Sequence, residues 1–126
     1  MRAVDTNVLV RLIARDDSRQ TTAAENFIEQ GAWVSVLALA EATWVLSSVY
    51  DVNSDELATA IEMFLNHRHL VVQEEEAVAR SLELFRQRPA LGFSDCLMVE
   101  LARKAGHLPL GTFDRNLATV DGTQKI

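Results

Sequence analysis

The chain has 126 residues, 48% of them hydrophobic, which is enough apolar material for the core of one domain but not of two. We therefore expect a single domain over residues 1–126. The net charge of −6 argues against a protein that coats nucleic acid by bulk electrostatic attraction, unless bound divalent ions offset several of the 18 acidic residues.

The cysteine count and the apolar segments indicate a cytoplasmic protein with no membrane contact. Cys96 is the only cysteine, which excludes an internal disulfide; we expect it to be a small buried hydrophobic residue in a reducing compartment. The polar start MRAVDTN is unlike a signal peptide. Residues Gly31–Tyr50 are apolar enough to span a bilayer, but no basic residue flanks them between Arg19 and Arg68. We expect a helix buried in a protein core there.

Strand and helix patterns alternate along the chain. The predicted elements are a strand at Arg2–Val4, helices at Val8–Ala14 and Arg19–Gln30, a strand at Trp33–Val36, helices at Leu37–Val49 and at Ser54–Leu65 with Ser54 as N-cap, a strand at Leu70–Gln73, helices at Glu74–Gln87 and Ser94–Ala105, and strands at His107–Phe113 and Thr123–Ile126. This alternation predicts an α/β fold, a three-layer α/β/α domain around a parallel sheet of four or five short strands.

The first candidate acid, Asp5, directly follows the first predicted strand. Ligand sites of parallel sheets lie at the carboxyl ends of the strands, so this position favours a functional carboxylate. Thr6 and Asn7 come next, and these residue types steady a neighbouring carboxylate or hydrogen-bond the backbone of a turn. The alternative is that one of the two simply caps the helix that follows.

The second candidate, Glu41, is the only charge in an apolar helix. At helical spacing it shares a face with Leu37, Ala38, Trp44 and Val45, so we expect it to point inward. A buried carboxylate needs a partner, either a bound cation or a distant basic side chain. This helix and the one after it carry more apolar surface than one small sheet requires, which indicates a partner interface and a homodimer.

The third candidate, Asp95, lies at spacings of three, four and seven from Met98, Val99 and Ala102. We therefore expect it on the inward stripe of its helix, opposite a charged face with Glu100, Arg103 and His107. The alternative is an acid that only favours a helix N-terminus.

The fourth candidate, Asp114, directly follows the predicted strand His107–Phe113. The alternative is that it only caps the next turn. Four acids at strand ends or in the helices that follow them would share one rim of the sheet, and their repulsion is hard to explain unless hard cations bind there. Oxygen ligands suit Mg²⁺ or Mn²⁺, and two-metal phosphodiester hydrolases hold their ions about 3.5 to 4 Å apart. His67 and His69 lack the further ligands of a zinc site, and we interpret them as loop residues.

Four segments carry a resemblance to a known family: AVDTNVLVRL, LALAEATWVL, GFSDCLMVELARKAG and GTFDRNL. In this order they resemble the PIN-domain nucleases, and more closely the VapC-type toxins of bacterial toxin–antitoxin pairs. The resemblance implies an acidic quartet and supporting polar residues, namely Asp5, Glu41, Asp95 and Asp114 with Thr6, Asn7 and Thr112. Many relatives carry a further acid where this chain has Asn116, so the resemblance leaves open a second metal.

The resemblance implies a Mg²⁺- or Mn²⁺-dependent endoribonuclease that cleaves structured RNA such as tRNA or rRNA and stalls translation until a VapB-like antitoxin neutralises it. Asp5 and Asp95 would hold the main ion, with Glu41 and Asp114 completing the site. Candidates for contacting RNA phosphates are Arg11, Arg15 and Arg115. For the first two, the alternative is a solvated helix face.

Two other interpretations are a receiver-like signalling domain and a catalytically inactive PIN-like binding module. A receiver needs an acidic pair after the first strand, but Asp5 stands alone there, and residues Gln73–Glu76 offer no phosphoacceptor aspartate after the third strand. A binding module would be expected to have lost one of the four acids, and all four are present.

Overall fold

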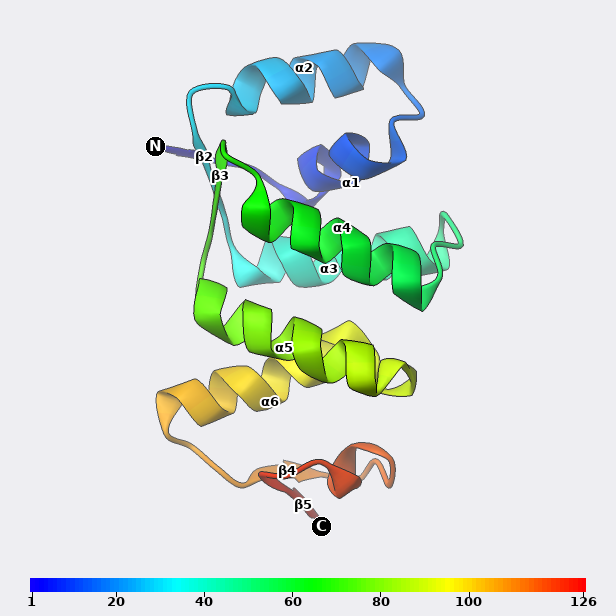
Figure 1. Ribbon diagram of the computed structural model, residues 1–126, viewed down its shortest axis with the longest axis vertical. Coiled ribbons are helices and arrows are strands. Elements are labelled where there is room, and N and C mark those ends of the chain that lie inside the picture. Colours follow the sequence, from blue (N-terminus) through cyan, green and yellow to red (C-terminus); the bar gives the residue numbers. More distant parts are fainter. The chain divides into compact units, whose positions relative to one another are not determined.

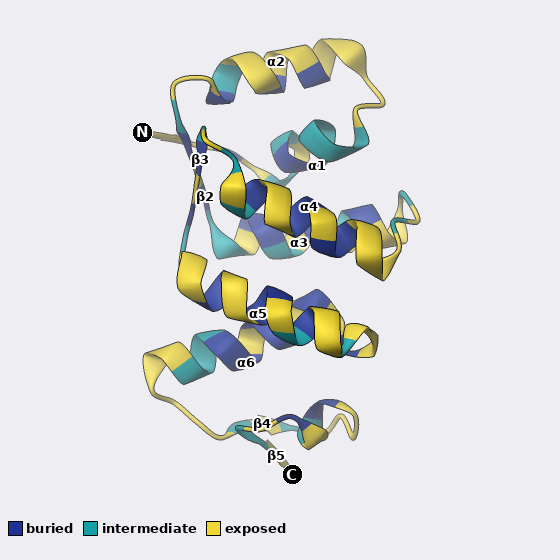
Figure 2. Ribbon diagram, viewed as in Figure 1, coloured by how far each residue is buried: buried dark blue, intermediate teal, exposed yellow.

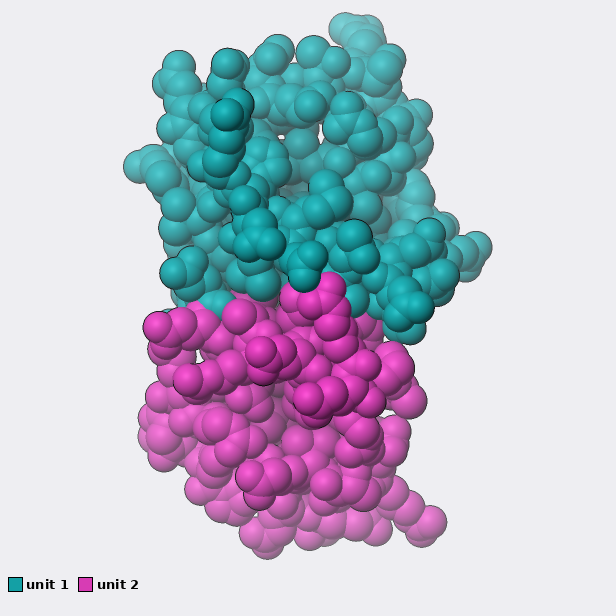
Figure 3. Space-filling view, viewed as in Figure 1, with its two compact units in different colours: residues 1–75 teal, residues 76–126 magenta.

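The computed structural model describes residues 1–126, which form two compact units (Figure 1, Figure 3). Unit 1 comprises residues 1–75 and unit 2 comprises residues 76–126. Two of the four candidate acids, Asp5 and Glu41, belong to unit 1. The other two, Asp95 and Asp114, belong to unit 2.

Unit 1 is built on a parallel three-stranded sheet. Its elements are β1 (Arg2–Ala3), α1 (Thr6–Ala14), α2 (Ser18–Ile28), β2 (Ala32–Val34), α3 (Val36–Ser48), α4 (Ser54–Asn66) and β3 (Leu70–Val72). The strand order is β1-β2-β3, and Trp33 of β2 pairs with Ala3 on one side and Val71 on the other. Helix α1 packs against α2 and α3, and α4 packs against α3 and β3.

The central strand of unit 1 explains where its core lies. In β2, Ala32 and Val34 are fully buried whereas Trp33 between them is exposed, as the two-residue period of a strand requires. Apolar side chains of the helices complete the core (Figure 2), and the fully buried large ones include Leu9, Val10, Ile28, Leu39, Leu46, Ile61 and Phe64. This sheet and its helices hold the start of α1, where Asp5 lies.

Unit 2 consists of two helices followed by a small parallel ladder. Its elements are α5 (Glu75–Gln87), the 3-10 turn η1 (Pro89–Leu91), α6 (Phe93–Ala105), β4 (Leu110–Thr112), the 3-10 turn η2 (Leu117–Thr119) and β5 (Thr123–Lys125). Strands β4 and β5 pair in parallel, with Gly111 opposite Gln124. The rings of Phe85 and Phe93 meet edge-on at 6.0 Å and join the end of α5 to the start of α6.

The predicted fold class is confirmed. All eleven predicted elements occur, every strand pairing is parallel, and the six helices are compatible with a three-layer α/β/α fold. The five strands pair as a three-stranded sheet, β1-β2-β3, and a two-stranded sheet, β4-β5. The strand predicted at His107–Phe113 contains only Leu110–Thr112, because the proline before it lacks a backbone N–H.

One local prediction, the N-cap of α4, is wrong, and another, the burial of Cys96, is confirmed. Ser54 is not the N-cap of α4: Asn53 is, in a capping box with Glu56, because its amide oxygen reaches the Glu56 N–H at 2.8 Å. Cys96 is fully buried as expected, and burial raises the pKa of its thiol to about 11. None of the helices has the length and apolar character needed to cross a bilayer.

Candidate functional site

Asp5 lies between the first strand and the first helix. The Val4 N–H donates to the Trp33 carbonyl at 3.1 Å, so the sheet holds the chain one residue before Asp5. Asp5 is exposed, has an extended backbone, and accepts the Val8 N–H on Oδ1 at 3.2 Å. It is therefore the N-cap of α1. The alternative that Thr6 or Asn7 caps this helix is wrong, because both already lie inside it.

Thr6 links α1 to the second candidate acid. Its hydroxyl donates to Oε2 of Glu41 at 2.8 Å, so the residue next to Asp5 orients the Glu41 carboxylate. Within unit 1, a hydrogen bond thus connects the residue after Asp5 to Glu41. The sequence had marked Thr6 as a supporting residue, and this contact shows which group it touches.

The expectation that Glu41 points inward is wrong. Glu41 is exposed, and Leu37 and Trp44 on the same face are each 67% exposed. Of the residues expected to share its face, only Ala38 is buried, and the buried residues of α3 are Ala38, Leu39, Ala42, Thr43 and Leu46. Because α3 is apolar nearly all round, periodicity could not show which side faces the core.

Asp95 lies in the first turn of α6 and is half-buried. The helix is preceded by its N-cap, Gly92, whose φ of +81° is a conformation that side-chain-bearing residues rarely adopt, although a Cβ there would meet no atom within 4 Å. Burial, followed by the charge of Asp114, raises the pKa of the Asp95 carboxyl. No lysine, arginine or histidine forms an ion pair with it.

The predicted orientation of α6 is wrong in part. Val99 is buried as expected, but Met98 is 49% exposed, and Glu100, expected on the charged outer face, is only 8% exposed. Arg103 explains this, because its guanidinium approaches the Glu100 carboxylate to 3.3 Å and also donates to the Asp121 carbonyl at 2.8 Å. The three-residue spacing of Glu100 and Arg103 was the signal in the sequence that could have indicated this pair.

Asp114 follows β4 and closes a tight turn. Its Oδ1 accepts two backbone N–H groups, from Asn116 at 2.8 Å and from Leu117 at 2.9 Å. Its own N–H donates to the hydroxyl of Thr112 at 3.0 Å. The capping role weighed as an alternative is therefore present. Because these bonds use Oδ1, they leave Oδ2 of this exposed side chain for another ligand.

The donor atoms of the four acids fit a hard divalent cation. All are carboxylate oxygens, and Asp95 is half-buried beside a second negative charge without a basic partner. Within each unit, no three histidine, cysteine or acidic side chains are grouped so that they could hold a metal. Each unit supplies two of the acids, and the meeting of all four at one ion remains a prediction.

The three arginines proposed to contact phosphates differ in their surroundings. Arg11 donates to the Tyr50 hydroxyl at 2.8 Å and to Asp16 at 3.3 Å, and the Tyr50 hydrogen bond raises the pKa of the guanidinium. Arg15 pairs with Glu25 at 3.3 Å. Arg115 is exposed next to Asp114 and makes no such bond. Arg115 is therefore the one of the three with an uncommitted guanidinium.

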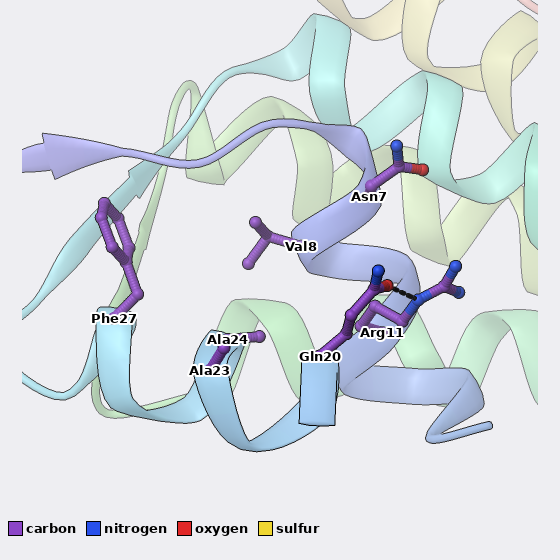
Figure 4. A pocket seen from close by; sticks show the side chains of 7 residues that line it. All are labelled: Asn7, Val8, Arg11, Gln20, Ala23, Ala24 and Phe27. Carbon is purple, nitrogen blue, oxygen red and sulfur yellow. Dashed lines mark hydrogen bonds between the residues drawn. The ribbon is translucent and has the colours of Figure 1, made fainter. Parts of the chain in front are cut away.

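A groove of about 420 Å³ lies between α1 and α2 (Figure 4). Its polar end has Asn7 and the hydrogen-bonded pair Arg11 and Gln20, and its other end has the ring of Phe27. The remaining lining residues are small or apolar, namely Val8, Ala23 and Ala24. Asn7 is two residues after Asp5 in the sequence, although Asp5 itself does not line the groove.

A family model described as the PIN domain matches residues 2–123, and the chain therefore belongs to the PIN domain family. This family has a nuclease-type fold, and its members are generally metal-dependent nucleases. Comparison with curated proteins and with solved structures found no match. The resemblance noted in the sequence is thus confirmed at the level of the PIN domain.

Proposed function

We propose that this protein is a metal-dependent endoribonuclease toxin of a type II toxin–antitoxin pair that cleaves structured RNA such as tRNA or rRNA. Membership of the PIN domain family supports a nuclease, and the residues that match the VapC-type pattern support the toxin assignment. The protein is expected to act in the cytoplasm as a single nuclease domain over residues 1–126.

The observation that carries this proposal is the Asp95 carboxyl. Burial and the negative charge of Asp114 both disfavour its ionised form, and no basic side chain compensates. In a protein that binds no ligand there, such an arrangement would only lower the free energy of unfolding. A divalent cation would supply the missing positive charge, which is why we assign Asp95 to a metal site.

Asp5 and Asp95 are proposed to hold the main ion, Mg²⁺ or Mn²⁺, with Glu41 and Asp114 completing the site. When bound, the cation supplies an activated water for in-line attack on phosphorus and stabilises the negative charge on the phosphoryl oxygens. The four carboxylates are the catalytic residues of the proposal.

The chain's own polar residues orient those carboxylates. Thr6 holds Oε2 of Glu41, and Thr112 holds the main chain of Asp114. The cap formed by Asp5 uses Oδ1 and fixes that side chain to the start of α1. Asn7, in the first turn of α1 and on the rim of the groove, is placed to contact substrate.

Arg115 is the preferred candidate for binding an RNA phosphate, because it is exposed, uncommitted and adjacent to Asp114. Arg11 and Arg15 are retained as candidates, although both already pair with acids of unit 1, which favours a role in holding α1 to its neighbours.

Two partners other than RNA are proposed. A VapB-like antitoxin would cover the largely apolar groove of Val8, Ala23 and Phe27, which is lined by α1, the helix that Asp5 caps. A second copy of the chain would cover the apolar side chains that α3 and α4 leave exposed, which are Leu37, Trp44, Val49 and Met63.

The test is an RNA cleavage assay with purified protein in Mg²⁺, in Mn²⁺ and in EDTA. We expect cleavage with either metal and none with the chelator. Sequencing of RNA 5′ ends after brief expression in cells would identify the substrate and the cleaved bond. If a demonstrably folded sample never cleaves RNA in a metal-dependent way, the chain is better described as a PIN-like binding module.

A further inference from the structure

We propose that Arg88 is a positioning residue that fixes Asp114 relative to Asp95. This inference deepens the proposed function and rests on the metal site assigned above. It is carried by the hydrogen bonds of one guanidinium and by the place of Arg88 in the chain, between α5 and α6.

The side chain of Arg88 binds the turn that follows Asp114. Its Nη2 donates to the Thr119 hydroxyl at 2.9 Å, to the Asn116 side-chain oxygen at 3.3 Å and, more weakly, to the Asn116 carbonyl at 3.5 Å. Thr119 in turn donates to the Asn116 carbonyl at 2.7 Å. Asn116 therefore bonds both to Arg88 and to Asp114, whose Oδ1 accepts the N–H groups of Asn116 and Leu117.

The main chain of Arg88 is fixed on the other side, next to the helix that carries Asp95. Its N–H donates to the Leu84 carbonyl at 2.8 Å and extends the hydrogen bonding of α5. Its carbonyl accepts the Leu91 N–H at 3.1 Å at the start of η1. Gly92 follows directly as the N-cap of α6, in whose first turn Asp95 lies.

Arg88 therefore connects two segments that carry one acid each. A residue spacing of 19 separates Asp95 from Asp114 along the chain, and β4 lies between them. The guanidinium thus adds a direct connection between the segment before α6 and the turn 114–119, beside the bond from Arg103 of α6 to the Asp121 carbonyl. All of these bonds come from one nitrogen, Nη2, so a lysine, whose side chain is shorter but whose ammonium has three donors, should keep part of them.

The charge of Arg88 allows a test that separates positioning from electrostatics. Removal of a positive charge near a cation site should, by Coulomb's law alone, strengthen cation binding. Loss of positioning should weaken it. The two effects have opposite signs, so the direction of change in Mn²⁺ affinity identifies which one dominates.

The experiment measures Mn²⁺ binding to the full chain by electron paramagnetic resonance of free Mn²⁺, for wild type, R88A, R88K and the control R80A. Arg80 is exposed on α5 and makes no ion pair or hydrogen bond, so R80A removes the same charge without removing a contact. We expect R88A to weaken binding by about tenfold or more, as for other residues that support metal ligands. The Mn²⁺ affinity of R88K should lie between those of R88A and wild type, and the affinity of R80A should match that of wild type. Binding by R88A as tight as wild type, or tighter, would overturn the proposal.

A second measurement does not depend on metal. Amide hydrogen exchange at Asn116 and Leu117 reports directly on the bonds to Asp114 Oδ1, and it should accelerate several-fold in R88A and in T119V but not in R80A. If wild type binds no Mn²⁺, the proposed function fails, but hydrogen exchange still tests whether Arg88 holds the turn that follows Asp114. If wild type binds Mn²⁺ but exchange is unchanged in R88A and T119V, only the role of Arg88 fails. Should R88A not fold, R88K and T119V carry both measurements.

Discussion

In residues 1–75 both candidate acids are tied to helix α1 by hydrogen bonds, whereas in residues 76–126 one candidate acid is held by packing alone. Asp5 caps α1, and Glu41 accepts a hydrogen bond from the next residue, Thr6. Asp114 accepts two backbone N–H groups. Asp95 accepts no hydrogen bond; it is half-buried, and its pKa is raised by burial and by Asp114.

This difference shows that Asp95 lowers the stability of the metal-free protein in a way that the three hydrogen-bonded acids do not. A carboxylate that caps a helix stabilises the fold whether or not a ligand is present. A half-buried carboxylate near a like charge, without a basic partner, opposes folding until something neutralises it. Among the four proposed metal ligands, Asp95 should therefore lower the unfolding free energy of the metal-free protein most. Substitution of Asp95 and substitution of a hydrogen-bonded acid should affect stability differently.

The largest effect is expected for Asp95→Asn. Cleavage of RNA should fall by more than about 100-fold, beyond the range known for residues that only support a metal ligand. The metal-free protein should be as stable as wild type or more so, because one of two repelling charges is removed. Activity assays in Mg²⁺ and thermal unfolding in EDTA would measure both.

The matched control for this variant is Glu83→Gln, which makes the same chemical change at an exposed position of α5. It should alter neither cleavage nor stability. A large drop in the melting temperature of metal-free Asp95→Asn would contradict the assignment, because it would mean that the carboxylate supports the fold through an ion pair.

The next effect compares two substitutions of Asp5. Asparagine caps helices as well as aspartate does, so Asp5→Asn should keep the stability of wild type, whereas Asp5→Ala should lose about 0.5 to 2 kcal/mol of unfolding free energy. Both should lose metal-dependent cleavage, because neither supplies a charged oxygen. Urea unfolding beside the cleavage assay would separate the two roles; an active Asp5→Asn would show that the carboxylate is not a metal ligand.

The smallest effect concerns pH. The folded state holds the Asp95 proton to a higher pH than the unfolded chain does, so the folded state binds more protons between the ordinary pKa of 3.8 and the raised pKa. In EDTA, this residue's contribution should therefore lower the unfolding free energy of wild type as pH rises through that window. The advantage of Asp95→Asn over wild type should grow over the same window, and unfolding curves between about pH 3 and 7 would show it. A constant difference would mean that burial does not perturb this carboxyl.

The sequence predicted the elements well because their patterns are local. Alternating strands and helices, the glycine at the end of α6 and the short apolar strands each depend on neighbouring residues. Asp5 and Asp114 could also be selected from their positions after strands, and Glu41 and Asp95 from the apolar helices that contain them. Their orientations could not, since these depend on contacts far along the chain.

Glu41 and Glu100 illustrate this limit. The apolar residues of α3 surround the helix, so no periodicity distinguishes the exposed face of Glu41 from the buried one. Glu100 was expected outside because it is charged, yet it is buried with Arg103, which in turn binds the Asp121 carbonyl 18 residues further along. Arg88 was missed for the same reason, because its acceptors lie about 30 residues away.

Cys96 has a practical consequence for studying this molecule. Its sulfur is fully enclosed and its thiol is protonated at neutral pH, so alkylating reagents have neither access to it nor a thiolate to attack. It is also the chain's sole sulfhydryl. The rate at which such a reagent modifies the native protein therefore reports how often the region around α6 opens. Cys96 is thus an intrinsic probe of local unfolding that needs no engineered label.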